Sequence, residues 1–373
     1  TKTLDQISTN LDSRRVPITK DVRASGEYPY YGASGIVDYV ADYIFDEDTL
    51  LISEDGANLL ARSTPIAFPA SGKYWVNNHA HILKFENLTT QRFVELYLES
   101  IPLDGYITGA AQPKLNQKAL NSIPIPIPPL PEQQRIVGIL DEAFEGIATA
   151  KANAEKNLQN ARALFESHLQ SVFTQSGMGW VETTIGETCT LRSGTTVSPT
   201  LEKPIGDIPY LKVADMTFDG NEDQITTSSR FLSDEDVRES AIIPKGATIF
   251  PKRGGAILTN KKRITSLPIC ADLNIMAVIP SSQIDAGLLY FYFLNVDMRK
   301  LGTGSSIPQI NNYDVAPLLI SFPKSLATQG QIVSKFDSLR EETQRLEAIY
   351  QQKLAALDEL KKSLLHQAFT GEL

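Results

Sequence analysis

Two short basic stretches in the second half of the chain carry side chains suited to an anionic partner. They read PKRGG (Pro251–Gly255) and NKKR (Asn260–Arg263), and each lies beside glycine or polar turn residues. Basic side chains in such loops suit contacts to nucleic-acid phosphates, and arginine, lysine and asparagine can also hydrogen-bond base edges. A solvated hairpin without a ligand is the alternative. The candidate DNA-binding residues here are Lys252, Arg253, Lys261, Lys262 and Arg263.

The first part of the chain offers less positive charge at the matching place. The stretch SEDGANLLARS (Ser53–Ser63) is followed by GKYWVNNH (Gly72–His79). Asparagine can pair with adenine and arginine with guanine. The candidates here are therefore Asn58, Arg62, Lys73, Asn77 and Asn78. Trp75 is expected in the core rather than as a platform for base stacking.

Two glycine-led turns add further polar side chains. They read TGAAQPKLN (Thr108–Asn116) and TGSSIPQIN (Thr303–Asn311), with Thr, Gly, Pro and Asn in matching places. Their side chains are either DNA contacts or structural caps. As DNA contacts, the candidates are Gln112, Lys114, Ser305, Ser306 and Gln309.

The sequence offers little that suggests catalysis. It has no GxxxxGK[ST] phosphate loop, no GxGxxG, no HExxH, and no Asn-Pro-Pro or Asp-Pro-Pro followed by an aromatic residue, as amino-methyltransferases have. His79 and His81 alternate on an expected strand and would face one side, where they could share a ligand; half-buried structural histidines are the simpler alternative. Cys189 and Cys270 carry no motif. We expect a binding protein with no catalytic residue, metal or cofactor of its own.

Length and composition describe a soluble, multidomain protein. The 373 residues exceed one ordinary domain, and no apolar run is long enough to span a bilayer. Two cysteines without metal-ligand spacing suit a reducing compartment, so we expect a cytoplasmic protein. The net charge of −9 argues against a protein that coats nucleic acid. An acidic DNA-binding protein would need a basic partner.

Two long helices must position these residues. The stretches Pro131–Phe173 and Gln329–Phe369 align without a gap, 196 positions apart (369 − 173 = 196). Their apolar residues recur in steps of three and four, which is typical of a coiled-coil seam. The sequence predicts that the two helices pair with each other through Ile136, Leu140, Ile147, Leu158, Leu169, Ile332, Phe336, Leu354, Leu357 and Leu365.

The segments before these helices also repeat. TLLISEDGA (Thr49–Ala57) resembles TIFPKRGGA (Thr248–Ala256), and the two glycine-led turns follow in the same order. Short apolar runs between turn residues predict strands, with a helix at Thr90–Ser100 capped by Thr89 or Thr90. We therefore predict an α+β fold, with two mixed, strand-rich α/β modules joined by two antiparallel helices around a pseudo-two-fold axis. The predicted boundaries are 1–128, 129–176, 177–324 and 325–373.

The chain resembles the specificity subunit of type I restriction–modification enzymes over nearly its whole length. The resemblance lies in PLPEQQRIVGILDEAF (Pro129–Phe144), in the closing LLHQAFTGEL (Leu364–Leu373), and in the TG segment before each long helix. The second helix departs from the family pattern, because it begins KSLATQGQIV (Lys324–Val333) and lacks the proline–glutamate start. The chain also begins nearly at the first module.

This resemblance implies a function. In that family each module is a target recognition domain that reads one half of a bipartite double-stranded DNA target. The helices set the spacing and dock the methyltransferase subunits, of which two are expected, and a restriction and translocation subunit joins the complex. The specificity subunit has no catalysis of its own, so S-adenosylmethionine is expected only on the methyltransferase. The resemblance transfers no base-contacting residue.

Three other functions remain open from the residues alone. The chain could serve a related fused nuclease–methyltransferase system, which only neighbouring genes would distinguish. It could be a coiled-coil tether that dimerises, although the internal duplication lets its helices satisfy each other. It could also be an enzyme with an unrecognised site, in which case the purified protein would consume S-adenosylmethionine alone.

Overall fold

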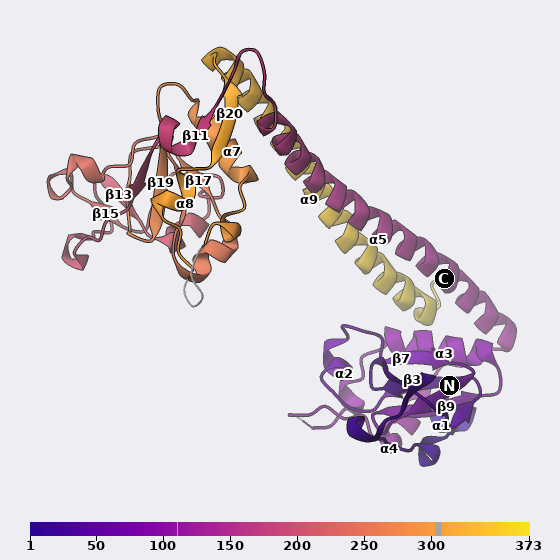
Figure 1. Ribbon diagram of the computed structural model, residues 1–373. Coiled ribbons are helices and arrows are strands. Elements are labelled where there is room, and N and C mark those ends of the chain that lie inside the picture. The colour runs from indigo at the N-terminus through magenta and orange to yellow at the C-terminus, as the bar shows by residue number, and fades with distance from the viewer. Residues whose placement is uncertain (110, 303–307) are drawn as a thin grey trace. The chain divides into compact units, whose positions relative to one another are not determined.

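The structure is a computed structural model that describes residues 1–109, 111–302 and 308–373. The chain forms two compact units, which are unit 1 (Thr1–Glu155 with Gln351–Leu373) and unit 2 (Lys156–Tyr350). Two long helices, α5 (Leu130–Phe173) and α9 (Leu326–Thr370), each contribute one part to either unit (Figure 1). Each unit also holds one strand-rich module. We call these module one (residues 1–128) and module two (residues 177–324).

Module one contains two four-stranded sheets and a short pair. The first sheet has the order β2 (Ser8–Asn10), β9 (Ala80–Phe85), β6 (Thr49–Ser53), β7 (Ala67–Ala70). The second has the order β4 (Gly35–Val40), β3 (Ser25–Gly32), β8 (Lys73–Val76), β5 (Phe45–Asp46), and β1 (Lys2–Thr3) pairs with β10 (Pro124–Ile125). Short helices are α1 (Leu4–Ile7), α2 (Asn58–Ala61) and α4 (Gln117–Asn121). All five residues of β6 are buried, so this strand is covered on both faces.

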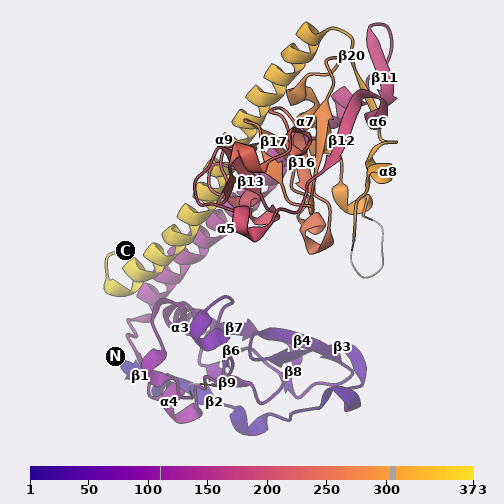
Figure 2. The same cartoon turned by 90° about the vertical axis from the view of Figure 1, so that its left-hand side faces the viewer.

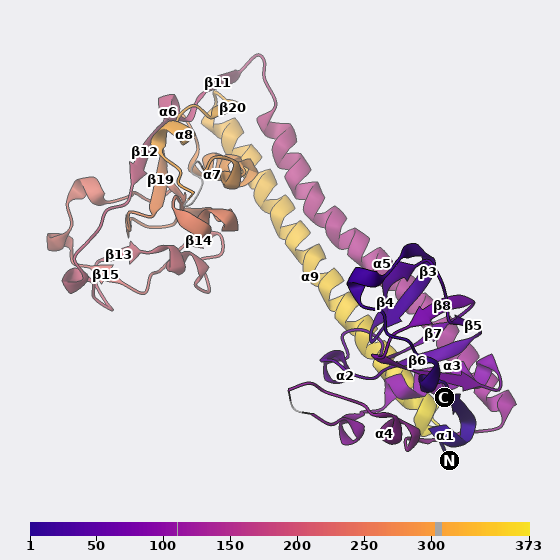
Figure 3. The same ribbon diagram turned by 60° about the horizontal axis from the view of Figure 1, so that its bottom comes forward.

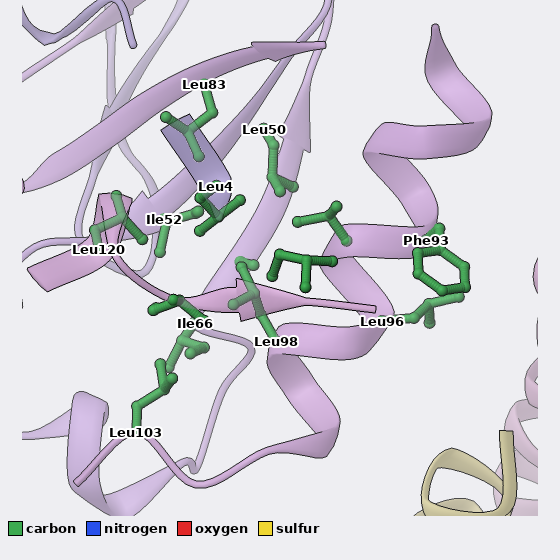
Figure 4. Close-up of a cluster of buried hydrophobic side chains, with 14 of the residues drawn as sticks. Leu4, Leu50, Ile52, Ile66, Leu83, Phe93, Leu96, Leu98, Leu103 and Leu120 are labelled. Atoms are coloured by element: carbon green, nitrogen blue, oxygen red, sulfur yellow. The ribbon is translucent and has the colours of Figure 1, made fainter. Parts of the chain in front are cut away.

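Helix α3 (Leu88–Ser100) closes the core of module one against the first sheet (Figure 2). Leu50 and Leu83 from the strands and Phe93 from the helix lie in one buried apolar cluster (Figure 4). The helix begins two residues earlier than predicted, because the Asn87 side chain accepts a hydrogen bond from the Thr90 amide. Asn87 is therefore the cap, in place of the predicted Thr89 or Thr90.

Module two repeats this plan. Its larger sheet has the order β12 (Cys189–Ser193), β19 (Ile275–Pro280), β16 (Thr248–Pro251), β17 (Arg263–Thr265), β14 (Gln224–Ile225). A second sheet has the order β15 (Phe231–Leu232), β13 (Ile208–Leu211), β18 (Cys270–Ala271), and β11 (Trp180–Thr184) pairs with β20 (Leu319–Pro323). Its helices are α6 (Ile185–Thr188), α7 (Ala286–Asn295) and α8 (Asn312–Val315). The predicted fold class and internal repeat are confirmed.

One predicted alignment inside the repeat is wrong by one residue. Leu50 lies opposite Leu83 in module one, and Thr248 lies opposite Val278 in module two. In β9, Leu83 lies two residues before the partner of the first residue of β2. In β19, Val278 lies two residues before the partner of the first residue of β12. Leu50, not Thr49, therefore corresponds to Thr248. The shared threonine misled the sequence alignment, and a slip of one residue turns every side chain of a strand to the other face.

The long helices run antiparallel within each unit, as predicted (Figure 3). In unit 1 Lys151 on α5 pairs with Asp358 on α9 at 2.7 Å, and in unit 2 Arg162 pairs with Glu347 at 2.9 Å. The two ion pairs have the same antiparallel register. The residue on α5 advances by 11 positions (162 − 151) while its partner on α9 goes back by 11 (358 − 347). Five predicted pairing residues join the cores of the modules, namely Ile136, Leu140 and Leu365 in unit 1 and Leu169 and Phe336 in unit 2. Ile147 is buried, and the half-buried ones are Leu158, Ile332, Leu354 and Leu357.

A buried glutamine marks the start of both long helices. Gln133 donates through Nε2 to the Pro128 carbonyl at 2.8 Å, and Gln329 donates to the Pro323 carbonyl at 2.7 Å. The two glutamines are 196 positions apart (329 − 133 = 196), as the helices are. The second helix therefore keeps the entry of the first, although its sequence lacks the proline–glutamate start. Among the described helices, none is both long and apolar enough to cross a membrane.

Candidate nucleic-acid interface

In each module a backbone bridge joins the chain just after one strand to the glycine-led turn. We call this place the ledge. It consists of the two residues that follow the strand and the turn residue that lies opposite the second of them. In module two, Gly254 N donates to the Pro308 carbonyl at 2.8 Å and Ile310 N donates to the Lys252 carbonyl at 2.9 Å. Arg253 thereby lies opposite Gln309. The ledge of module two therefore consists of Lys252, Arg253 and Gln309 on a fixed backbone.

Arg253 is the cation that the ledge of module two leaves available. Its side chain is exposed and makes no hydrogen bond to any residue that the structure describes. Lys252 beside it is half-buried and donates through Nζ to Ser193 Oγ at 2.7 Å. Burial, followed by the charge of Arg253, lowers the pKa of Lys252. Gln309 donates to the Asn311 side chain at 2.6 Å, next to α8. Arg253 can therefore meet an outside acceptor without breaking an interaction within the described part of the chain.

Lys262 corrects the sequence prediction. Its side chain is only 2% exposed and donates through Nζ to the Val296 carbonyl at 2.7 Å and to Asn260 Oδ1 at 2.8 Å. Val296 follows the last residue of α7, so the ammonium group satisfies a carbonyl at the end of that helix. Burial lowers the pKa of Lys262 to about 8. A buried cation committed to two internal acceptors cannot reach a DNA phosphate.

The rest of the NKKR stretch is divided between the fold and the solvent. Arg263 donates through Nε to the Asn221 carbonyl and through Nη1 to the Lys262 carbonyl, the second at 2.7 Å. Lys261 is half-exposed and has no side-chain hydrogen bond within the described residues. Ser305 and Ser306 lie outside the described residues. The basic surface of this region therefore consists of Arg253, Lys252 and Lys261 rather than the whole predicted set.

Arg62 in module one also corrects the prediction. Its side chain donates to the Leu98 carbonyl at 3.1 Å and to the Ile101 carbonyl at 2.8 Å, at the end of α3. Arg62 and Asn260 are the two non-glycine residues with positive φ in the described chain, 50° and 53°, and each follows a short helix. Asn58 folds the same turn by accepting from Thr64 N at 3.1 Å. The turn after α2 is thus structural.

The ledge of module one carries the opposite charge. Leu115 N donates to the Glu54 carbonyl at 2.8 Å, and Asp55 bridges Lys114, so Glu54 and Asp55 occupy the places of Lys252 and Arg253. Glu54 is buried and pairs with Arg15 at 2.5 Å and with Lys114 at 3.1 Å. Burial alone would raise the pKa of Glu54, but hydrogen bonds from Arg15 and Lys114 hold it below its usual value.

His81 extends this network into the core of module one. Its Nδ1 lies 2.5 Å from Asp12 Oδ2 and its Nε2 lies 2.7 Å from the Leu115 carbonyl. Both ring nitrogens of His81 therefore contact oxygen atoms inside the module. His79 pairs separately with Asp55 at 2.8 Å, so the two histidines do not share a ligand. Among the described residues, no group of His, Cys, Asp or Glu is arranged to hold a metal.

The remaining candidates of module one are spread over several turns. Lys73 is exposed over the Tyr43 ring at 4.6 Å, and Asn78 and Gln112 are exposed. Asn77 is buried and accepts a hydrogen bond from His79 N at 2.8 Å. Trp75 is half-buried and belongs to no core cluster of the described residues, which differs from the prediction, and it donates to the Val16 carbonyl at 2.6 Å. Sequence reasoning missed Asp12, Arg15 and Glu54, because these residues meet only through contacts between positions far apart in the sequence.

Comparisons with known proteins agree on one family. A family model described as the type I restriction modification DNA specificity domain matches residues 1–159 and 178–355. A putative type I restriction enzyme specificity subunit of Haemophilus influenzae is 27% identical over 345 residues, covering 91% of this chain and 87% of that protein. A chain from a structure on complex assembly and conformational transition of the type I R-M system superposes with TM-score 0.72 at 16% identity, covering 100% and 97%. The HsdS subunit of Thermoanaerobacter tengcongensis superposes with TM-score 0.59 at 16% identity, covering 100% and 96%.

Proposed function

The chain belongs to the type I restriction modification DNA specificity family, and on that premise we propose that each module reads one half of a bipartite DNA target. The observation that carries this proposal is the ledge. Two modules with one backbone plan present opposite charges at the same place, with Glu54 and Asp55 in one and Lys252 and Arg253 in the other. Equal scaffolds with different surfaces suit two readers of different sequences.

The long helices complete the proposed function. Within each unit they pair with each other and enter the core of that unit's module. We propose that their exposed faces dock methyltransferase subunits, two in number, and that a restriction and translocation subunit joins through that complex. The chain itself would carry no catalysis and no S-adenosylmethionine, and the complex would work in the cytoplasm. The family match over both modules disfavours a simple coiled-coil tether.

Methylation mapping in cells tests this function. The chain is expressed with its cognate methyltransferase in a host that lacks other methylation, and all methylated sites are read. We expect one bipartite motif with two short defined halves and a fixed gap. Replacing residues 1–128 by another module of the family should change one half only. A single continuous motif, or a change in both halves, would contradict independent reading by the modules.

A further inference from the structure

A second turn contacts the ledge in each module, and it leads into β9 in module one and into β19 in module two. In module one, Glu54 N donates at 2.9 Å to the carbonyl of His79, the last residue before β9. In module two, Lys252 N donates at 2.8 Å to the carbonyl of Asn274, the last residue before β19. His79 and Asn274 therefore occupy equivalent places beside the two ledges.

His79 is fixed at three points in module one. Besides its carbonyl, its amide donates to Asn77 Oδ1 at 2.8 Å, and its ring Nδ1 lies 2.8 Å and 3.0 Å from the two carboxylate oxygens of Asp55. A carboxylate accepts hydrogen bonds, so Nδ1 carries a proton, and Nε2 of the neutral ring is then an acceptor. The His79 side chain is 46% exposed, and its Nε2 bonds to none of the residues that the structure describes. The fold thus orients the ring and leaves one polar atom uncommitted.

Module two distributes these roles differently. The side chain of Asn274 donates to Asp272 Oδ1 within its own turn at 2.5 Å. Arg253, at the place of Asp55, is exposed and donates to no described residue. In module one the ledge residue Asp55 is bound by the turn, and the turn residue His79 has the uncommitted atom. Each ledge region therefore has an exposed side chain with an uncommitted nitrogen, which comes from the turn in module one and from the chain after β16 in module two.

The charge of the Asp55–His79 pair decides which class of DNA contact it suits. With a neutral ring the pair carries one negative charge, and with a protonated ring it carries none. Neither state is positive, so the pair cannot neutralise a phosphate and release its counterion, as lysine and arginine do. A base edge requires no positive charge, and the amino groups of adenine and cytosine donate hydrogen bonds in the major groove. The acceptor Nε2 suits these two bases.

We propose that His79 recognises an adenine or a cytosine in the half of the target assigned to module one, by accepting a hydrogen bond at Nε2 from the amino group of that base. Asp55 is a positioning residue, which holds the ring and keeps the proton on Nδ1. The inference rests on the function proposed above and adds a residue, a class of base and the direction of the hydrogen bond. Arg253 carries only donors, so the two modules differ at this place in the bases that they can recognise.

DNA binding by the complex with the cognate methyltransferase tests this contact. Duplexes are made in which the amino group of one adenine or one cytosine is replaced by hydrogen, at each position of the target in turn. At one position of the module-one half, this change should weaken binding of the wild type roughly three- to ten-fold, as expected for one hydrogen bond. His79→Ala should abolish this loss at that position. His79→Phe, which keeps a ring but lacks the acceptor, should do the same.

Asp55 is tested through the same ratio of affinities. Asp55→Ala should reduce the loss at the position that His79 recognises, because the ring is no longer held. The double variant of Asp55 and His79 should match His79→Ala, since a residue that acts only through the ring adds nothing once the ring is removed. A further loss of discrimination at another position in the double variant would mean that Asp55 does not act through His79 and would overturn its positioning role.

Lys84→Ala is the matched control, because Lys84 is 50% exposed and also pairs with an acid of module one, Glu47, at 2.6 Å. It should keep every loss seen with the wild type, and no variant should change those in the module-two half. Equal weakening of all duplexes by His79→Ala would indicate a phosphate contact, and unchanged losses at every position would place His79 outside the interface. Either result would overturn the inference. A wild-type complex without preference for a bipartite target would instead refute the proposed function.

Discussion

The two ledges occupy the same place on the same backbone, yet they handle charge in different ways. Module one joins Asp12, Arg15, Glu54 and His81 in one network of polar contacts in which every member is buried or half-buried. Module two replaces that network by one hydrogen bond between Ser193 and Lys252 and leaves Arg253 exposed. The shared fold therefore tolerates a complete exchange of polar residues at this point.

Arg253 also differs from every arginine of module one. All five arginines of module one donate to an internal partner, namely Arg14, Arg15, Arg23, Arg62 and Arg92. Arg253 of module two donates to none of the residues that the structure describes. A basic residue in a turn is therefore a candidate for a DNA contact only when no nearby carbonyl or carboxylate already binds it.

The largest effect is expected from a deletion that should destabilise unit 1 and leave unit 2 folded. Deleting Gln351–Leu373 removes Leu365 and Ala368 from the core of unit 1 and exposes Ile136 and Leu140. The core of unit 2 contains none of the deleted residues. We expect hydrogen exchange to show loss of protection in module one and retention in module two. Equal loss in both modules would mean that the units do not fold independently.

The next prediction tests the buried network of module one. Arg15→Ala leaves the Glu54 and Asp12 carboxylates with less compensation, and should lower the free energy of unfolding by roughly 3–5 kcal/mol. The matched control is Arg14→Ala, whose half-exposed pair with Glu47 should contribute less than about 1 kcal/mol. Urea unfolding followed by a probe in module one measures both. Equal effects of the two changes would refute a special role for the network.

Lys262 provides a pH test of module two. Its pKa of about 8 lies below that of an unfolded lysine, so between pH 8 and about 10.4 the unfolded chain binds more protons. Stability from this group should therefore rise with pH in that window, by at most about 1.4 kcal/mol per pH unit. Lys262→Met should remove this slope, whereas Lys261→Met should keep it. Unfolding curves at pH 8, 9 and 10 give the comparison, and identical slopes in both variants would contradict the buried placement.

The smallest expected effect tests the difference in charge between the two ledges. Arg253→Ala should weaken DNA binding by the assembled complex without changing its unfolding. A guanine contact would reduce discrimination by about 1–3 kcal/mol at one position of the half read by module two. A phosphate contact would weaken all sequences alike and lower the salt slope by about one. Arg299→Ala, which removes an exposed arginine already paired with Asp297, is the control. Unchanged binding in the Arg253 variant would exclude the ledge from the interface.

The sequence alone determined the framework of this protein. The recurrence of apolar residues and the constant offset of 196 predicted two paired helices and two modules, because periodicity and duplication are properties of the chain itself. The structure confirmed antiparallel pairing within each unit and the repeated order of strands. It also supplied what no motif indicated, the buried Gln133 and Gln329 at the two helix starts.

Only the tertiary structure decided which polar residues are free. Lys262 and Arg62 are of the residue types that contact DNA. Each nevertheless binds carbonyls at the end of a helix some 34 to 39 positions away in the sequence. Arg253 is also a basic residue in a turn, but its side chain remains exposed. The difference arises from non-local packing, which brings unpaired carbonyls to one cation and solvent to another. The strand register acts in the same way, because a slip of one residue in the alignment would place Glu54 instead of Asp55 at the position of Arg253, and Glu54 is buried.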